Sequence, residues 1–441
     1  MNSTTTALPL SSVSPGDTAW MLMSTALVFL MIPGLGFFYA GMARSHSALS
    51  LIFLSMLALA IVSLEWFLWG YSLSFAPDST NPFIGNLRHI SFFNLHSIDA
   101  IHPNAPNVPA LVYAIYQSMF AAITPAIAFG AVENRTRVLP CIVFIFLWTS
   151  IVYNPVAYWN WAPHGWAKHL GALDFAGGTP VHVVSGMAAL AYTLRVGHRS
   201  EFNTRQRTDP HNYFYILLGT ALLWFGWFGF NGGSAGAANL RACNAIVVTN
   251  LSASISALTW TVVSYFRHDK KWSSFGYCGG AVAGLVTITP ASGYVAPWAA
   301  VIIGICAGIV CNFASDLKYT LNYDDALDVF GVHGVGGMLG CILTGIFAQS
   351  SVISLDGSKE QGGWLDGNWM QLPVQLASLT SAAAWSFCLT YIILSLMDLC
   401  PPLRLRMDPA QEDMGMDVAE LGEDMYGYLK QHKTINVLHE K

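Results

Sequence analysis

The sequence predicts an all-α integral membrane protein with eleven transmembrane helices, arranged as two inverted five-helix repeats plus one extra helix. Of its 441 residues, 54% are hydrophobic and only 10% are charged, whereas a soluble domain carries about 25% charged residues. A soluble fold cannot bury that much apolar surface. Because about 20 apolar residues cross a bilayer, the chain can be cut into eleven candidate spans: 18–40, 48–75, 110–131, 138–160, 177–196, 212–232, 243–266, 276–290, 296–317, 327–348 and 371–397.

These spans divide the chain into three parts. Residues 1–17 form an N-terminal segment, residues 18–397 the membrane domain and residues 398–441 a C-terminal tail. The membrane domain has halves at 18–196 and 212–348 and a last helix at 371–397. The first span is interpreted as a permanent helix and not as a signal peptide, because no basic stretch precedes it and Arg44 follows it.

The distribution of Lys and Arg predicts the orientation. An odd number of spans places the two termini on opposite sides, and basic residues concentrate on the cytoplasmic side. With the N-terminus outside, sixteen of the twenty basic residues are cytoplasmic, and the other four are Arg88, Lys168, Arg241 and Lys359. We therefore expect a multi-pass plasma membrane protein with a cytoplasmic tail, and an Asn2-Ser3-Thr4 sequon on the side where glycosylation can occur.

Composition also bounds the partners and cofactors. The formal net charge is -5 and no block of basic residues is present, so neither a nucleic acid nor an anionic lipid surface is expected as a partner. The eight cysteines occur without a CxxC or a metal-ligand spacing, and we interpret them as small packing residues. No metal and no cofactor is therefore expected.

Two segments resemble each other more than any others in the chain. They are LDFAGGTPVHVVSGM at 173–187 and LDVFGVHGVGGM at 327–338, in which VHVVSGM and VHGVGGM agree at five of seven positions. Because they fall in the fifth and tenth spans, their helices cross the membrane in opposite directions. Chance agreement between apolar helices is the alternative explanation. Folds built from inverted repeats place their transport path near the midplane, where the halves meet.

Each copy of this segment carries one histidine. His182 and His333 are the only histidines placed well inside a predicted span. A lone histidine on an apolar face of a soluble protein is usually a core residue, but an ionisable residue in a membrane span is costly and usually faces a cavity or a partner. Since a neutral imidazole offers one donor and one acceptor, we expect the pair to line a pore for a small polar permeant.

Asp174 and several aromatic residues lie near predicted span ends. Asp174 precedes Gly177 and Gly178, so it is expected either to cap the helix or to lower the potential for an entering cation, and both roles can hold together. The aromatic residues include Trp159, Trp161, Tyr116, Phe120 and the run WFGFNGGS at 227–234. Interfacial belts explain most such residues, although aromatic faces also hold monocations.

Five motifs together resemble the ammonium transporter family of bacteria, plants and fungi. They are DFAGGTPVH, WFGFNGGSAG, ITPASGYVAP, DVFGVHGVGG and GMDVAELGEDMY in the tail, and the resemblance runs over residues 20–428. It implies a homotrimer in membrane lipid, with one pore in each subunit between two inverted five-helix halves. It also implies that ammonium or ammonia is the substrate, with methylammonium as a further candidate, and it suggests a regulatory partner at the tail.

The resemblance assigns an outer recruitment site for ammonium. Trp161 in YWNWAP, Phe120 in YQSMFAAIT and Ser234 in FNGGSAG would form this site, with Tyr116 in its wall. Tyr116 stands where many bacterial members have Phe, which indicates the fungal branch. The segment between Trp161 and Asp174 is one residue longer than in the family, so the assignment of Trp161 rests on a less exact match than the others.

The resemblance also assigns the path below this site. Phe120 and Phe230 would form a stacked gate, His182 and His333 would be the twin histidines of the pore, and Asp174 would be the acidic residue near the entrance. The expected mechanism is recruitment of the ammonium ion, its deprotonation and conduction of ammonia, with or without a separately moved proton.

Other functions and one departure of the tail remain open. The tail reads Leu421-Gly422-Glu423 where bacterial relatives read His-Gly-Glu, so its contacts are expected to differ. An added role as an ammonium sensor remains an alternative. An intramembrane enzyme would need three or four converging ligands or acid–base groups, and the spans supply no further His, Cys or Glu near the histidine pair. We therefore expect a transporter or channel and not an enzyme.

Overall fold

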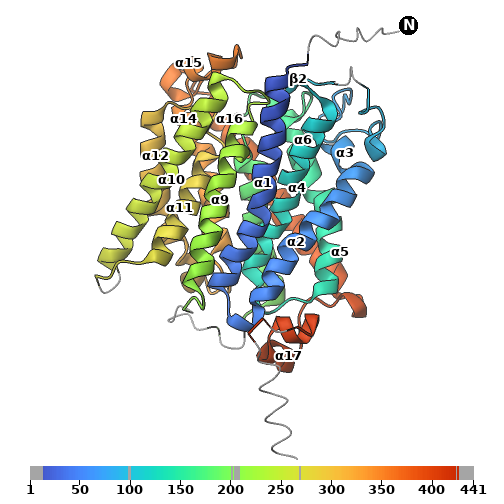
Figure 1. The fold of residues 1–441 in the computed structure, drawn as a ribbon, viewed down its shortest axis with the longest axis vertical. Coiled ribbons are helices and arrows are strands. Elements are labelled where there is room, and N and C mark those ends of the chain that lie inside the picture. Colours follow the sequence, from blue (N-terminus) through green and yellow to red (C-terminus); the bar gives the residue numbers. More distant parts are fainter. Residues whose placement is uncertain are drawn as a thin grey trace, which may run out of the picture.

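The computed structural model describes residues 13–97, 101–199, 202, 209–267, 270–423 and 425–426. In this part of the chain, long helices run side by side between two faces (Figure 1). The upper face in that view carries the start of α1 and the short helix α15, and the lower face carries α17. The segment 1–12 with its sequon, Arg205, Arg207 and the tail beyond residue 426 lie outside the described residues.

Nine described helices are long and apolar enough to cross a membrane. Two more helical segments, at 178–196 and 274–288, are mostly buried among the others. They face protein rather than lipid, which explains why they are short or less apolar. The predicted eleven spans are confirmed.

In chain order, the eleven spans are formed by α1 (Pro15–Met42); α2 (Ala48–Glu65), η3 (Trp66–Gly70) and α3 (Tyr71–Phe75); α4 (Ala110–Phe129); α5 (Val138–Trp148), η6 (Thr149–Tyr153) and α6 (Asn154–Trp161); η7 (Gly178–Val183) and α8 (Val184–Val196); α9 (Tyr213–Gly233); α10 (Leu240–Arg267); α11 (Ser274–Ile288); α12 (Pro297–Ala314); η8 (Phe330–Gly334) and α14 (Val335–Phe347); and α16 (Gln371–Asp398).

The connecting segments hold only short elements. On the upper side these are η4 (Ile90–Phe92), a two-stranded antiparallel hairpin of β1 (Ile101–His102) and β2 (Ala105–Pro109), α7 (Trp166–His169), α15 (Ser350–Ile353), η9 (Ser354–Asp356) and η10 (Trp364–Asp366). On the lower side they are η2 (Ser45–Ser47), η5 (Gly130–Val132), α13 (Leu317–Leu321), η11 (Pro401–Leu403), α17 (Pro409–Met414) and η12 (Asp417–Leu421).

Several spans begin where the sequence supplies a cap. The Ser14 hydroxyl accepts the backbone N–H of Asp17 at 3.2 Å, and Pro15 occupies the first helical position of α1. The Asn212 side chain accepts the N–H of Tyr215 at 3.1 Å at the start of α9. Such side chains replace intrahelical partners that the first turn lacks, so the span boundaries follow from local chemistry as well as from hydropathy.

The two matched segments pack against each other at the centre of the bundle. η7 contacts α14, and η8 contacts α8. A Cβ at Gly186 would overlap the backbone of Gly334, and a Cβ at Gly337 would lie 3.0 Å from the Cβ of His182. Since Gly186 and Gly337 occupy matching positions in the two copies, each copy uses its glycine to approach the other. This reciprocal contact is the packing expected at the meeting point of two repeat halves.

Both histidines lie in π-helical turns, His182 in η7 and His333 in η8. A π turn inserts one residue into an α-helix and frequently marks a functional position. Hydropathy alone does not predict such turns. Their presence in both copies, at the same residue of the match, supports the repeat.

Candidate functional site

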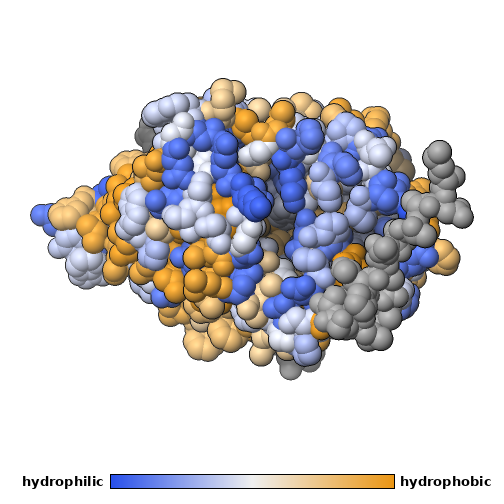
Figure 2. All heavy atoms as spheres, turned by 90° about the horizontal axis from the view of Figure 1, so that it is seen from above, coloured by the Kyte–Doolittle hydropathy of each residue, from blue (hydrophilic) through white to orange (hydrophobic). Residues whose placement is uncertain are grey.

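The upper face is hollowed at its centre. Seen from above, hydrophilic residues surround the hollow, and hydrophobic residues lie around the periphery of the molecule (Figure 2). The hollow is a vestibule of about 1010 Å³ whose lining includes Tyr116, Trp161, Asp174 and Ser234. The structure therefore brings together at one opening residues that the sequence places on four different segments.

Phe120 lies below the vestibule and links its aromatic wall to a second phenylalanine. The ring of Phe120 meets Trp161 edge to face at 6.0 Å between centroids, and it stacks on Phe230 at 4.1 Å with 27° between the ring planes. Tyr116 meets Phe120 at 5.0 Å. The stacked pair separates the vestibule from the interior of the bundle.

Tyr116 and Ser234 both hold the backbone that carries Phe230. The Ser234 hydroxyl donates to the Phe230 carbonyl at 2.8 Å, and the Tyr116 hydroxyl lies 2.8 Å from the same carbonyl and 3.0 Å from that of Gly229. Tyr116 and Ser234 are 3.3 Å apart. The tyrosine hydroxyl therefore gives this wall polar contacts that a phenylalanine would lack.

Trp161 is fixed by its own polar contacts. Its indole N–H donates to the Asp174 carbonyl at 3.0 Å, and its carbonyl accepts from Asn104 at 3.0 Å and from Lys168 at 3.2 Å. Its ring also stacks on Phe75 at 6.2 Å. The extra residue between Trp161 and Asp174 is absorbed by the loop around α7, because the contact between the two residues is still made. Neither Phe75 nor Asn104 was predicted, since nothing in their local sequence links them to Trp161.

Asp174 forms the cap that its position predicts. One carboxylate oxygen accepts the backbone N–H groups of Gly177 and Gly178 at 2.8 Å each, and the other accepts that of Thr179 at 2.6 Å. Gly177 has φ 111°, a left-handed conformation that glycine adopts without strain. Asp174 thus organises the start of the turn that carries His182, and its role in transport remains a prediction.

The two histidines meet below the stacked phenylalanines. Their Nδ1 atoms are 3.3 Å apart, which lets one neutral ring donate to the other. The His182 ring lies 5.5 Å from Trp227 and 6.1 Å from Phe230 in stacked arrangements. Trp227 is held by a bond from its indole N–H to Thr289 at 2.9 Å. Trp227 belongs to the aromatic run noted in the sequence, but its contact with His182 was not predicted.

A small chamber surrounds this pair. It measures about 10 Å³, close to the space that one water molecule needs. Apart from the two histidines and Trp227 its lining is aliphatic or phenyl: Met31, Leu35, Phe38, Ile123, Ile127, Val181, Leu223, Phe230 and Val282. A second cavity of about 20 Å³ continues toward the lower face, with His333 and Asp328 in its lining.

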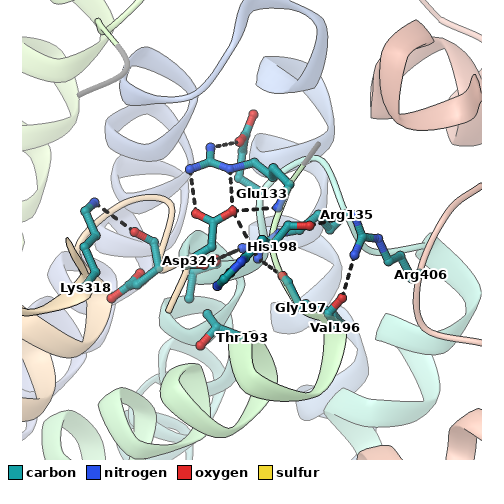
Figure 3. Close-up of polar contacts among 12 residues, drawn as sticks. Glu133, Arg135, Thr193, Val196, Gly197, His198, Lys318, Asp324 and Arg406 are labelled. Atoms are coloured by element: carbon teal, nitrogen blue, oxygen red, sulfur yellow. Dashed lines mark hydrogen bonds and ion pairs between the residues drawn. The ribbon is translucent and has the colours of Figure 1, made fainter. Parts of the chain in front are cut away.

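The lower ends of the three segments that carry Phe120, His182 and His333 are joined by a buried ion cluster (Figure 3). Arg199, after α8, donates to Glu133, after α4, at 2.9 Å and to Asp324, before η8, at 2.8 Å. Arg135 lies 3.4 Å from the same Asp324 carboxylate. Burial raises the pKa of the Asp324 carboxyl, but the charges of Arg135 and Arg199 together hold this pKa below its usual value. The cluster therefore ties Phe120, His182 and His333 together through the ends of their helices.

Comparison with known proteins decides the family. A family model described as Ammonium Transporter Family matches residues 19–426. The chain is 49% identical to Ammonium transporter 1 of Schizosaccharomyces pombe, covering 94% of this chain and 82% of that protein. It is 44% identical to Ammonium transporter MEP2 of Saccharomyces cerevisiae, covering 93% and 83%. The crystal structure of Candida albicans Mep2 matches with a TM-score of 0.86 at 44% identity, over 91% of this chain and 88% of that chain.

The chain belongs to the Ammonium Transporter Family. Its similarity to these fungal proteins agrees with the branch that Tyr116 indicates. The relatives compared are transporters by name, and the alternative of an intramembrane enzyme is set aside on this ground.

The tail of this family member docks on its own chain. The Asp417 carboxylate accepts the backbone N–H groups of Leu49 and Ser50 at 3.1 Å and 2.7 Å and so caps α2. Glu420 accepts the N–H of Val138 at 2.8 Å and caps α5. Asp417 and Glu420 belong to the DVAE part of the tail motif. Leu421, where the sequence differs from its bacterial relatives, takes no part in these contacts.

Proposed function

We propose that this chain carries ammonium across the plasma membrane, with the upper face outside and the tail in the cytoplasm. The observation that supports this most is the order of the site residues from the upper face downward. An aromatic vestibule comes first, a stacked phenylalanine pair follows, and a chamber the size of a water molecule holds the two histidines.

Recruitment takes place at the aromatic wall. Trp161 and Phe120 hold the ammonium ion by their ring faces, which attract cations, and the Ser234 hydroxyl accepts one of its hydrogen bonds. Ammonium and potassium ions are similar in size, so attraction to the rings alone does not separate them. The hydroxyl adds a partner that only a hydrogen-bond donor uses.

Discrimination follows below the phenylalanine pair. An ion that enters a small apolar chamber loses its water at a high cost in free energy. Ammonium alone among the competing ions avoids this cost by giving up a proton, and ammonia then passes between His182 and His333. The pair offers ammonia a donor and an acceptor without a fixed charge. The proton either stays outside or moves separately.

The assembly proposed is a homotrimer in membrane lipid, with one such path in each subunit and no cofactor. Methylammonium is a further candidate substrate. The docked tail is the surface on which a regulatory partner would act, because displacing Asp417 and Glu420 uncaps α2 and α5.

Electrical recording from purified protein in liposomes tests this function. An ammonium pulse should give a current if the proton moves separately. A potassium pulse of equal concentration should give little or no current. Empty liposomes and an Asp174→Ala variant are the matched controls. Equal currents for both ions would make the protein a cation channel. Uptake of labelled methylammonium without current would show that the proton does not follow. The absence of both current and uptake would overturn the proposal.

An added sensing role is the second candidate. A solved structure named Sensor Amt Protein matches this chain with a TM-score of 0.82 at 32% identity, over 92% of this chain and 98% of that chain, so the same fold occurs in a protein named as a sensor. The test is an ammonium-dependent change in the protease sensitivity of the tail in a variant that cannot transport. An unchanged tail would remove this candidate.

A further inference from the structure

The last span lies outside the inverted repeat, yet it carries a row of buried polar side chains. Along α16 these residues bond to the first repeat half. Their partners are the Gly171 carbonyl for Gln371, the Leu173 backbone for Gln375, the Asn160 side chain for Ser378, the Val184 carbonyl for Ser386 and the Trp148 indole for Thr390. A polar group facing lipid or protein without a partner is costly. This row therefore fixes how α16 sits on the first half.

One member of the row makes an unusual clamp. The Gln375 amide accepts the backbone N–H of Leu173 at 2.7 Å and donates to the carbonyl of the same residue at 2.7 Å. Its NH₂ also lies 3.3 Å from the Cys341 carbonyl on α14. Gln375 is only 3% exposed and Leu173 only 4%. One side chain thus holds both polar groups of one residue and reaches the second repeat half.

The clamped residue directly precedes Asp174. The Asp174 carbonyl accepts the Trp161 indole N–H, and the Asp174 carboxylate caps the turn that leads to His182. A shift of the Leu173 backbone would therefore move the partner of the Trp161 ring. The neighbouring contact of Ser378 with Asn160, one residue before Trp161, holds the other end of this loop.

We propose that Gln375 is a positioning residue for the outer ammonium site and acts through the Leu173–Asp174 backbone on the orientation of Trp161. This inference rests on the proposed function. It gives the eleventh span a role in substrate affinity, which its place outside the repeat does not suggest. Gln375 does not line the vestibule itself, whereas Leu173 and Asp174 do.

The test is a double-mutant cycle on apparent ammonium affinity. Gln375→Leu should raise the KM for ammonium uptake by about twofold to tenfold, the fold-change that corresponds to the net contribution of one hydrogen bond. Maximal uptake per trimer should change less. Because both variants disturb the same ring, Gln375→Leu combined with Trp161→Leu should be no worse in KM than Trp161→Leu alone.

Thr390→Val is the matched control. It removes a buried bond of 2.8 Å on the same helix, to Trp148, away from the vestibule. Alone, it should leave the KM of the parent unchanged. Added to Trp161→Leu, it should leave the KM of that variant unchanged. If Gln375→Leu does not assemble, Gln375→Glu is measured in the same way, because it keeps the side-chain volume and the acceptor for the Leu173 N–H.

Three results are decisive. The inference is supported if Gln375→Leu raises the KM of the parent but does not raise the KM of the Trp161→Leu variant. The inference is overturned if Gln375→Leu leaves the KM unchanged, or if the two losses multiply in the double variant. In either case, ammonium uptake by the parent chain leaves the proposed function standing. Absence of ammonium uptake by the parent chain overturns the proposed function itself.

Discussion

The two copies of the repeat start with the same Leu-Asp pair, but the two carboxylates make different contacts. Asp174 accepts three backbone N–H groups of the turn that follows it. Asp328 has φ 60° and pairs with the Lys318 ammonium at 2.6 Å. The cap of the second copy comes from Asp325, which accepts the N–H of Phe330 at 2.7 Å.

This difference has an electrostatic consequence. The backbone N–H groups at a helix start together act as about half a positive charge, whereas Lys318 brings a full one. We therefore expect the contacts of Asp174 to compensate its negative charge less fully than Lys318 compensates that of Asp328. Counted back from the histidines, Asp325 lies eight residues before His333, as Asp174 lies eight residues before His182. The cap therefore keeps its distance from the histidine, and the shared Leu-Asp pair does not.

The largest effect is expected from changing the upper carboxylate. Asp174→Ala removes both cap and charge and should abolish transport. Asp174→Asn should keep partial activity, because asparagine caps a helix about as well as aspartate. Uptake by equal amounts of assembled protein is the measurement. Complete loss in the Asn variant with normal assembly would show that charge outweighs capping at the entrance.

The histidines come next, because they lie where the two copies meet. His333→Ala leaves His182 without its partner at 3.3 Å and should lower transport by about fivefold to a hundredfold, the range for an unsatisfied buried polar group. His182→Glu should keep ammonium transport and admit more potassium, since a carboxylate stabilises a partly hydrated cation. A parental potassium flux in this variant, measured in the same liposomes, would place discrimination above the histidines.

Substitution of Trp161 tests the recruitment site at the upper face. Trp161→Leu removes the ring face and should weaken the apparent ammonium affinity or selectivity by a few-fold to about thirtyfold, since a cation–π contact contributes about 0.5–2 kcal/mol. Assembly should be normal. Unchanged concentration dependence together with unchanged selectivity would remove Trp161 from the recruitment site.

The sequence predicted the spans and the histidine pair because both depend on local signals. Hydropathy locates a span, and the cost of an ionisable side chain in lipid marks His182 and His333. The cap by Asp174 followed from the glycines after it. The residues named by the family resemblance lie close together in the structure, but their roles in transport were inferred from motifs and not from physics.

The rest depends on contacts between distant segments. Asp325 caps the second copy eight residues before His333, as Asp174 caps the first copy eight residues before His182, but the positive φ of Asp328 and its ion pair with Lys318 are seen only in the structure. The π turns depend on how the two copies pack, which no periodicity encodes. Gln375 lies in an apolar helix 202 residues from Leu173, so nothing near it in the chain indicates the clamp.

Truncation of the tail tests the contacts at the lower face. Truncation after Met407 removes Asp417 and Glu420 and so uncaps α2 and α5. Each cap contributes about 1 kcal/mol, and transport should fall several-fold while insertion is kept, because all eleven spans precede the cut. Double substitution of Asp417 and Glu420 by Asn and Gln, which cap without charge, is the matched control and should transport more than the truncated protein. Parental uptake by the truncated protein would show that the tail is dispensable.

The smallest effect is expected from Asp328→Asn. Asparagine adopts a positive φ readily, so the backbone at this position should not change. Lys318 retains its bond of 2.9 Å to the Asp325 carbonyl, and the substituted asparagine still offers it a side-chain oxygen. Because the cap at Phe330 comes from Asp325, the turn carrying His333 should also persist. The substitution turns the ion pair into a neutral contact, but the Asp325 carboxylate still acts on the Lys318 charge. Uptake should therefore fall by less than about twofold, which corresponds to about 0.4 kcal/mol. A loss as deep as that of Asp174→Asn would mean that the two carboxylates act alike after all, and that the lower opening needs its charge as much as the entrance does.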